Sequence, residues 1–375
     1  MRLTRREVMF AGGLLLSSGA QIAYAQTEGK IVLGQSAAFT GPSAELGLRF
    51  NEGANLYFDS INAKGGVNGR QIELRQADDG YEPERTKANT QKFVAEGVLA
   101  LFGYVGTPTT LAAVPIATAA KIPLIAPFSG ATALRDPFNR YLIHIRASYD
   151  DETQAIVRHT SAVGQTKVAV FHQNDAYGQA GLSGVTKALG RAPMAIGLVE
   201  RNSKNVGAAV KTILAAEPQA IIQIGSYVAC AEFIFEARKA GFNGGFYNVS
   251  FVGTKALSTA LGASANGVVV SQVMPFPYSP RVPVASEYLG AIKASGRKDL
   301  EPNYSGIEGF VAAKVTVDAL QRAGKTLTSE ALINAFDSMQ KINVGGFGIE
   351  INPSKHAGSS FVEMVVLSGD GHVRR

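Results

Sequence analysis

The chain has 375 residues, of which 46% are hydrophobic, and a formal net charge of +6. This length predicts two domains, each with a sizeable core. The lysines and arginines are scattered and form no basic block, which argues against a nucleic-acid-binding protein.

The first residues have the parts of a secretory signal peptide. A charged start with Arg5 and Arg6 precedes a short apolar run at residues 9–16, and residues 23–25 read Ala-Tyr-Ala. The run is too short to span a bilayer as a helix, which takes roughly 20 apolar residues. We therefore expect residues 1–25 to be a signal peptide, and the paired arginines leave open whether export is of the general or the twin-arginine type.

Cysteine usage narrows the class of protein further. The single cysteine, Cys230, excludes an intramolecular disulfide and a zinc–thiolate site, and we expect it to be a small buried side chain on a helix. Because no cysteine stands at the expected cleavage point, no lipid anchor is expected. Residues 1–25 carry three arginines and one glutamate, so the remaining chain has a net charge of +4. These features predict a protein that is free in the periplasm.

Strand and helix patterns alternate through most of the remaining chain. Short apolar runs typical of buried strands occupy residues 30–38, 98–102, 122–126, 167–171, 194–198, 220–224 and 245–249, and residues 71–77 alternate like a strand. Helical spacing occupies residues 44–63, 84–96, 109–120, 151–163, 177–189, 206–215 and 228–240. Apolar strands between amphipathic helices indicate parallel sheets covered on both faces, with right-handed crossovers. The repeat restarts near residue 149, so we expect an α/β fold with two doubly wound units.

The final third of the chain is less regular. It predicts a strand at residues 268–272 and, at 344–351 and 360–367, an antiparallel pair of strands. Between them, helices are expected at residues 284–294, 304–323 and 329–336. No low-complexity linker occurs, so we expect short crossings between the two units.

Polar residues follow the predicted strands, where ligands bind in open parallel sheets. Thr107 is expected to cap a helix that has Pro108 at its first position, which would leave backbone N–H groups and a hydroxyl group for an anion. Ser129 follows the next strand, and a plain capped helix is the alternative. Tyr177 and Tyr227 follow equivalent strands of the second unit and suit a small organic ligand, although each could also be a packing residue.

Patterns typical of catalysis are absent from the sequence. It contains no G-x-S-x-G elbow, no GxxxxGK[ST] phosphate loop and no dinucleotide G-x-G-x-x-G. His172 ends a strand but has no apparent nucleophile as partner. Asp78 and Asp79 are expected to form a solvated turn because a hard cation wants more oxygen ligands. We therefore expect neither an enzyme nor a cofactor or metal; a periplasmic hydrolase that uses His172 is the alternative.

Five short motifs occur in a fixed order along the chain: Thr40-Gly41-Pro42, Asn62-Ala63-Lys64-Gly65-Gly66-Val67-Asn68-Gly69, Asp78-Asp79, Ala176-Tyr177-Gly178 and Ala237-Arg238-Lys239-Ala240-Gly241. Together they resemble the type I periplasmic binding proteins, in the branch typified by leucine/isoleucine/valine-binding proteins of ABC importers. The resemblance covers essentially the whole chain after residue 25, and the Asn-Ala-Lys-Gly-Gly block is its most specific part.

The resemblance implies a Venus-flytrap receptor whose two lobes are joined by a three-strand hinge. The N-terminal lobe would comprise residues 28–148 and 276–342, and the C-terminal lobe residues 149–275 and 343–375. Such a protein closes on a small molecule, here an amino acid or an organic or aromatic acid. It then docks, as a monomer, on an ABC permease in the inner membrane. A ligand-sensing receptor subunit with the same fold is a further alternative.

The resemblance also implies a set of ligand-binding residues. In the first lobe, Thr107 and the loop Ser129-Gly130-Ala131 would hold the ligand carboxylate. The second lobe would contribute Tyr177 and Tyr227. One departure stands out, because Ser250 occupies the position where amino-acid-binding relatives carry an acid for the ligand ammonium group. Burying an ammonium group without a countercharge is costly, so either another acid such as Glu308 reaches the pocket or the ligand has no ammonium group, and we favour the second possibility.

Overall fold

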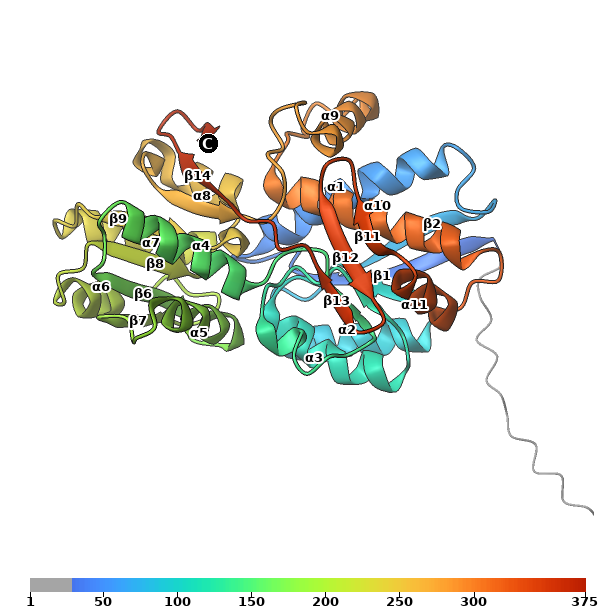
Figure 1. Ribbon diagram of the computed structural model, residues 1–375, viewed down its shortest axis with the longest axis horizontal. Coiled ribbons are helices and arrows are strands. Elements are labelled where there is room, and N and C mark those ends of the chain that lie inside the picture. Colours follow the sequence, from blue (N-terminus) through green and yellow to red (C-terminus); the bar gives the residue numbers. More distant parts are fainter. Residues whose placement is uncertain (1–28) are drawn as a thin grey trace, which may run out of the picture.

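The protein consists of two α/β lobes that lie side by side (Figure 1). The structure is a computed structural model that describes residues 29–375, so the expected signal peptide at residues 1–25 lies outside the described residues. The two parallel-sheet lobes confirm the fold class that the sequence predicts. Within residues 29–375, no helix combines the length and the apolar character needed to cross a membrane.

A five-stranded parallel sheet forms the centre of the first lobe, with the order β2-β1-β3-β4-β5. Its strands are β1 (Lys30–Ala37), β2 (Gln71–Asp78), β3 (Ala100–Phe102), β4 (Leu124–Ile125) and β5 (Leu142–Ile143). The helices of this lobe are α1 (Ala44–Asn62), α2 (Pro83–Ala95), α3 (Thr107–Ala119), α9 (Pro283–Ser295), α10 (Tyr304–Ala323) and α11 (Ser329–Asp337), with the short 3-10 helix η1 (Thr132–Leu134). Helix α1 packs against α10, and α2 packs against α3 (Figure 1).

The second lobe contains a seven-stranded sheet with the order β15-β14-β10-β9-β8-β6-β7. Its strands are β6 (Val168–Gln173), β7 (Ile196–Val199), β8 (Ala220–Ile224), β9 (Gly245–Asn248), β10 (Val269–Gln272), β14 (Glu363–Leu367) and β15 (Val373–Arg374). Its helices are α4 (Tyr149–Ala162), α5 (Ala176–Leu189), α6 (Gly207–Leu214), α7 (Tyr227–Lys239) and α8 (Thr254–Leu261), with the 3-10 helices η2 (Ser250–Val252) and η3 (Gly262–Ala265). The pairs from β7 to β10 are parallel, and β14 is antiparallel to β10.

Burial explains the apolar runs that predicted the strands. Every residue of β6 and β8 is buried, as expected for strands that helices cover on both faces. The predicted helix at residues 304–323 is confirmed without change as α10.

Glycines let α1 and α10 approach each other closely. A Cβ atom on Gly53 would lie 1.8 Å from the carbonyl oxygen of Gly306, and one on Gly309 would lie 2.0 Å from that of Phe50. The two helix backbones therefore touch where larger side chains would hold them apart. This contact fixes the position of α10, which carries Glu308 into the contact between the lobes.

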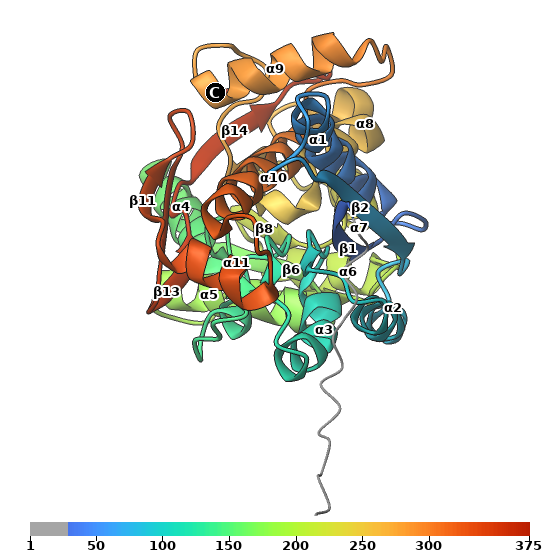
Figure 2. The same cartoon turned by 90° about the vertical axis from the view of Figure 1, so that its right-hand side faces the viewer.

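A separate three-stranded antiparallel sheet corrects one expectation about the end of the chain. It consists of β11 (Gln340–Asn343), β12 (Gly348–Asn352) and β13 (Lys355–Gly358) and lies beside α11 (Figure 2). Strand β12 contacts α11, and β13 contacts β5. The expected pairing of 344–351 with 360–367 is therefore wrong, because β12 pairs with β11 and β13 while β14 pairs with β10. The second-lobe segment expected from residue 343 reaches the second sheet only at Glu363.

Three segments of the chain connect the lobes. They are residues 144–148 between β5 and α4, residues 273–282 between β10 and α9, and residues 359–362 between β13 and β14. The carboxyl ends of strands from both sheets face the contact between the lobes, so the loops that follow those strands meet there.

Candidate ligand-binding site

Thr107 and Ser129 lie together in the first lobe, at the ends of neighbouring strands. Their hydroxyl oxygens are 2.8 Å apart, and both residues are fully buried. The Ala131 N–H donates to the Ser129 hydroxyl group at 3.3 Å. Thr107 is the first residue of α3 and not its cap, because the cap position belongs to Gly106 at φ 105°. The Thr107 hydroxyl group therefore faces Ser129, beside the free N–H groups of the first helical turn.

The loop of Gly130 packs directly on the second lobe. Its carbonyl oxygen accepts a hydrogen bond of 2.7 Å from the Tyr149 N–H at the start of α4. A Cβ atom on Gly130 would lie 2.6 Å from the Tyr149 ring, so a side chain there would push the lobes apart. Arg135 holds the same loop, because its guanidinium group donates to the carbonyl oxygens of Ser129 and Arg146 at 3.3 and 3.1 Å.

Aromatic rings from both lobes surround Phe251. Its ring centroid is 4.6 Å from that of Tyr177 in the second lobe, and 5.6 and 6.0 Å from those of Phe128 and Tyr81 in the first. Tyr177 is fully buried and its ring lies 5.4 Å from that of Tyr149. The hydroxyl group of Tyr177 has no hydrogen-bond partner among residues 29–375, and that of Tyr149 lies next to Ser129.

Burial raises the pKa of Tyr149 to about 12, although Arg146 nearby opposes the shift. The pKa of Tyr177 also lies well above its usual value, mainly because of burial. Both hydroxyl groups therefore stay protonated and can donate a hydrogen bond to an anionic ligand.

Ser250 belongs to a buried charged cluster between the lobes. Its N–H and hydroxyl groups donate to Glu152 at 2.7 and 3.0 Å, and Arg146 donates to its hydroxyl oxygen. Arg146 also lies 3.7 Å from Glu152 and 3.6 Å from Glu308. Glu308 thus reaches this part of the molecule, which was one of the two possibilities left open by the sequence. Burial raises the pKa of Glu308 to about 7, against the opposing effect of Arg146.

Tyr227 lies apart from the other expected ligand-binding residues. It is half-buried in a pocket of about 430 Å³ at the edge of the contact between the lobes. Glu45 and Arg49 of α1 and Lys255 of α8 also line this pocket. Of the described residues that line it, none is Thr107, Ser129 or Tyr177.

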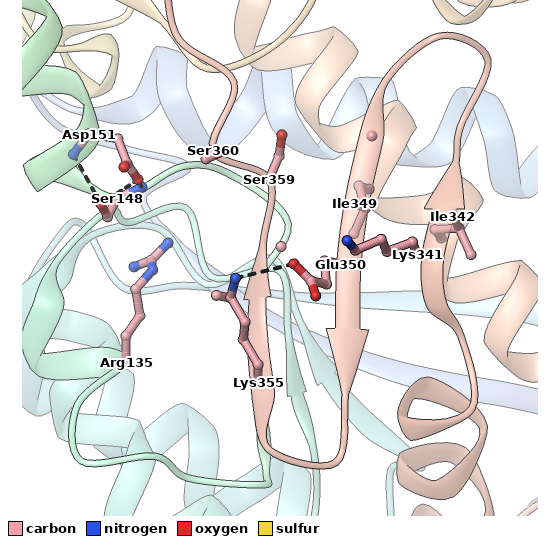
Figure 3. A pocket seen from close by; sticks show the side chains of 13 residues that line it. Arg135, Ser148, Asp151, Lys341, Ile342, Ile349, Glu350, Lys355, Ser359 and Ser360 are labelled. Atoms are coloured by element: carbon pink, nitrogen blue, oxygen red, sulfur yellow. Dashed lines mark hydrogen bonds and ion pairs between the residues drawn. The ribbon is translucent and has the colours of Figure 1, made fainter.

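A second pocket, of about 470 Å³, lies on the hinge side of the molecule (Figure 3). Arg135, Ser148 and Asp151 line it on one side, and Lys355 pairs with Glu350 across β12 and β13 (Figure 3). The Ser148 and Asp151 side chains form a capping box for α4. None of the seven expected ligand-binding residues is among the described residues that line this pocket.

The sequence also offered His172 as a candidate catalytic residue and Asp78 and Asp79 as candidate metal ligands. His172 is buried and bonds the carbonyl oxygen of Gln173 at 2.8 Å, and burial lowers its pKa. Asp78 is the last residue of β2 and bonds Thr40 and Arg85, and Asp79 is fully buried and bonds Ser36 and Thr86, so the expectation of a solvated turn is wrong for Asp79. No group of three or more His, Cys, Asp or Glu side chains within the described range could hold a metal ion.

Sequence analysis missed several residues of the site. Arg146 carried one signal, because it is a single charged residue between Ile145 and Ala147 in a segment that joins two predicted units. The sequence gives no sign of the role of Phe251 except its place directly after Ser250. Cys230 is confirmed as a buried helical side chain.

Arg201, Asn202 and Gln173 of the second lobe contact residues 80–82 of the first lobe, and this part of the contact between the lobes is called the mouth. Arg201 in the second lobe pairs with Glu82 in the first at 2.9 Å, and Asn202 donates to the Gly80 carbonyl oxygen at 3.2 Å. The Gln173 amide donates to the Tyr81 hydroxyl group at 3.5 Å. The structure is therefore a closed arrangement of the lobes.

Comparison with known proteins agrees with this geometry. Residues 30–371 match the family described as "Periplasmic binding protein". The chain is 28% identical over 298 residues to an amino acid binding protein of Pseudomonas aeruginosa, covering 76% of this chain and 78% of that protein. It is 24% identical over 261 residues to the Leu/Ile/Val-binding protein of Escherichia coli, covering 68% and 70% of the two chains.

Solved structures show the same relationship. A possible leucine/isoleucine/valine-binding protein from Rhodopirellula baltica superposes with a TM-score of 0.87 at 33% identity, covering 92% of this chain and 96% of that one. A substrate-binding periplasmic protein from Ralstonia solanacearum gives a TM-score of 0.87 at 32% identity, covering 92% and 99%. The chain belongs to the periplasmic binding protein family, whose members are binding proteins and not enzymes.

Proposed function

We propose that this protein captures a small carboxylate-bearing molecule between its two lobes and delivers it, as a monomer from the periplasm, to the membrane permease of an ABC importer. The observation that carries the proposal is the buried pair of hydroxyl groups of Thr107 and Ser129 at the start of α3. A helix N-terminus with two adjacent hydroxyl groups favours a carboxylate. Two relatives are named as binding proteins for amino acids, which are small molecules that carry a carboxylate group.

The second lobe supplies groups that complement this anion site. The Tyr177 hydroxyl group is buried and lacks a hydrogen-bond partner within the described chain, which is costly unless a ligand accepts from it, and the Tyr149 hydroxyl group lies beside Ser129. The rings around Phe251 offer apolar surface to the remainder of the ligand. Gly130, Ala131 and Ser250 complete the proposed set, and Tyr227 would contact only a ligand or an approach path that reaches the rim.

A ligand that touches both lobes stabilises the closed arrangement. It binds the closed state better than the open one, because only the closed state offers it the groups of both lobes, and this difference in affinity shifts the population. Release to a permease then requires only that the lobes separate, with no change in the chemistry of the ligand.

A thermal-shift screen of small carboxylates, with and without an amino group, tests the proposal. A ligand that binds only the folded state raises the melting temperature, and calorimetry should then give one ligand per chain. Recovery of the bound molecule after denaturation should return it unaltered. Turnover of the ligand, or the failure of every carboxylate to raise the melting temperature, would contradict the proposal.

A further inference from the structure

Arg146 has donors that the protein does not use. Its side chain is 1% exposed; its Nε atom forms the ion pair with Glu308 at 3.6 Å, and its Nη1 atom, which carries two N–H donors, finds no acceptor in the part of the chain that the structure describes. Its guanidinium carbon lies 4.6 Å from the centre of the Phe128 ring, which fixes the orientation of the group. An unsatisfied buried guanidinium is unfavourable, so these donors call for an acceptor from outside the chain.

This guanidinium group lies beside residues of the proposed site, since it rests on Phe128 and its charge acts on the pKa of Tyr149. Phe128, on which Arg146 rests, precedes Ser129 in the chain, and one guanidinium group, that of Arg135, binds the carbonyl oxygens of both Ser129 and Arg146. Arg146 also meets the second lobe, because it donates to Ser250. The unused donors therefore lie where first and second lobe meet around the proposed ligand.

The acids beside Arg146 do not offer a site for a ligand cation. Both carboxylate oxygens of Glu152 already accept hydrogen bonds, one from the Ser250 hydroxyl and the other from the Ser250 N–H and the Ser271 hydroxyl. Glu308 lies 3.6 Å from Arg146, so an ammonium group bound to Glu308 would stand beside a buried guanidinium group. Two buried like charges that share one carboxylate repel each other.

We infer that Arg146 is a specificity-determining residue of the site and that the ligand is an organic acid with no ammonium group, which presents a hydrogen-bond acceptor such as an oxo, hydroxyl or second carboxylate group to Arg146. The inference rests on the proposed function. It explains why the acids near Ser250 provide no site for an ammonium group, because Arg146 pairs with both Glu152 and Glu308.

Matched ligand pairs test the inference on the wild-type protein. Each standard amino acid is compared with the 2-oxo and 2-hydroxy acids that carry the same side chain, by thermal shift and then by calorimetry. We expect at least one oxo or hydroxy acid to raise the melting temperature while its amino acid does not. Binding of amino acids in preference to their analogues would overturn the inference and leave the proposed function intact. Failure of both sets would contradict the two together.

Variants of Arg146 test whether this residue sets the preference. We expect Arg146→Gln to weaken binding of the oxo or hydroxy acid at least ~10-fold, the loss expected for a charge-assisted hydrogen bond, and to narrow the preference over the amino acid. Arg146→Lys keeps the charge but not the planar donor geometry, so it should retain only part of the preference. Ser271→Ala is the matched control, because it removes one hydrogen bond to Glu152 without touching the ligand, and it should leave the preference unchanged.

The deciding quantity is the ratio of the affinity for the oxo or hydroxy acid to the affinity for the amino acid. A merely structural role for Arg146 would weaken the binding of all ligands equally and leave this ratio unchanged. A folded Arg146→Gln protein with unchanged preference would overturn the inference. If that variant does not fold, the ratio of the two affinities in Arg146→Lys decides instead, and a ratio equal to that of the wild type would overturn it as well.

Discussion

The Thr107 hydroxyl group bonds Ser129 and not the backbone of its own helix, so we expect it to act in ligand binding. Thr109 and Thr110 lie on the same helix, and their hydroxyl groups donate to backbone carbonyl oxygens, among them that of Gly106. The Thr107 hydroxyl group instead meets Ser129. Only the removal of the Thr107 hydroxyl group should therefore act on binding.

We predict that Thr107→Val weakens ligand binding about 10- to 100-fold, the value of one hydrogen bond to a charged group. Calorimetry with a carboxylate that the wild type binds measures the loss. Thr110→Val is the control, because its hydroxyl group bonds only the Gly106 carbonyl oxygen in the described structure, and its affinity should stay within about twofold. Equal losses in the two variants would show that α3 acts through its stability and not through Thr107.

Glu308 should make the stability of the protein depend on pH. Its pKa is raised to about 7 in the folded state, first by burial, whereas the unfolded chain has a value near 4.3. Between these values the folded state binds the proton and the unfolded state does not, so stability rises as the pH falls from about 7.5 to 5. Asp79, with a pKa of about 6, adds to the same trend.

Urea unfolding of the ligand-free protein across this range measures the effect. The titration of one carboxyl group gives the plot of unfolding free energy against pH a slope of at most about 1.4 kcal/mol per pH unit. We expect Glu308→Gln to remove most of the slope above pH 6, where Asp79 contributes less. A Glu308→Gln protein with the same slope as the wild type would contradict the role of this carboxyl group.

Residues of the site differ in how far the sequence can predict them. Thr107 and Ser129 were found because the carboxyl ends of parallel strands meet at one edge. Arg146 was not found, because its importance comes from acids that lie 6 and 162 positions away in the chain, as the ion pairs to Glu152 and Glu308 show. Phe251 was missed for the same reason, since its aromatic neighbours Tyr81, Phe128 and Tyr177 come from three different segments.

At the scale of elements, the contact of α1 with α10 decides the shape of the first lobe. We predict that Gly53→Ala destabilises the protein by about 1–3 kcal/mol or more, because its Cβ atom would lie 1.8 Å from the Gly306 carbonyl oxygen and must force the helices apart. Urea unfolding measures the change in free energy.

A matched glycine separates packing from helix propensity. Gly290 lies on the exposed side of α9 with no described atom within 4 Å of a Cβ atom, so Gly290→Ala should stabilise by about 0.5–1 kcal/mol. Stabilisation by Gly53→Ala as well would mean that α1 and α10 do not touch in solution.

Elements near the end of the chain were harder to predict than those of the repeat. The strand pattern of residues 344–351 is confirmed only in part. Strand β12 begins at Gly348, after a turn that is closed by hydrogen bonds between Val344 and Phe347. The pattern does not say which strand it pairs with, because the choice between β11, β13 and β14 depends on contacts with α11 and β5.

At the scale of the whole molecule, function depends on the balance between open and closed lobes. The pair between Arg201 and Glu82 crosses the mouth, and both side chains are partly exposed, which limits its contribution. We predict that Arg201→Ala lowers ligand affinity about 2- to 5-fold by favouring the open state. Arg140→Ala, which breaks an exposed pair with Glu330 inside the first lobe, should leave affinity unchanged. Equal effects would argue that the contact across the mouth has no part in closure.

Small-angle scattering tests the central claim most directly. With a saturating carboxylate that raises the melting temperature, the wild-type protein should show a smaller radius of gyration than without it, and the Thr107→Val protein at the same ligand concentration should show a smaller change or none. The same dimensions with and without bound ligand in the wild type would contradict capture by closure of two lobes.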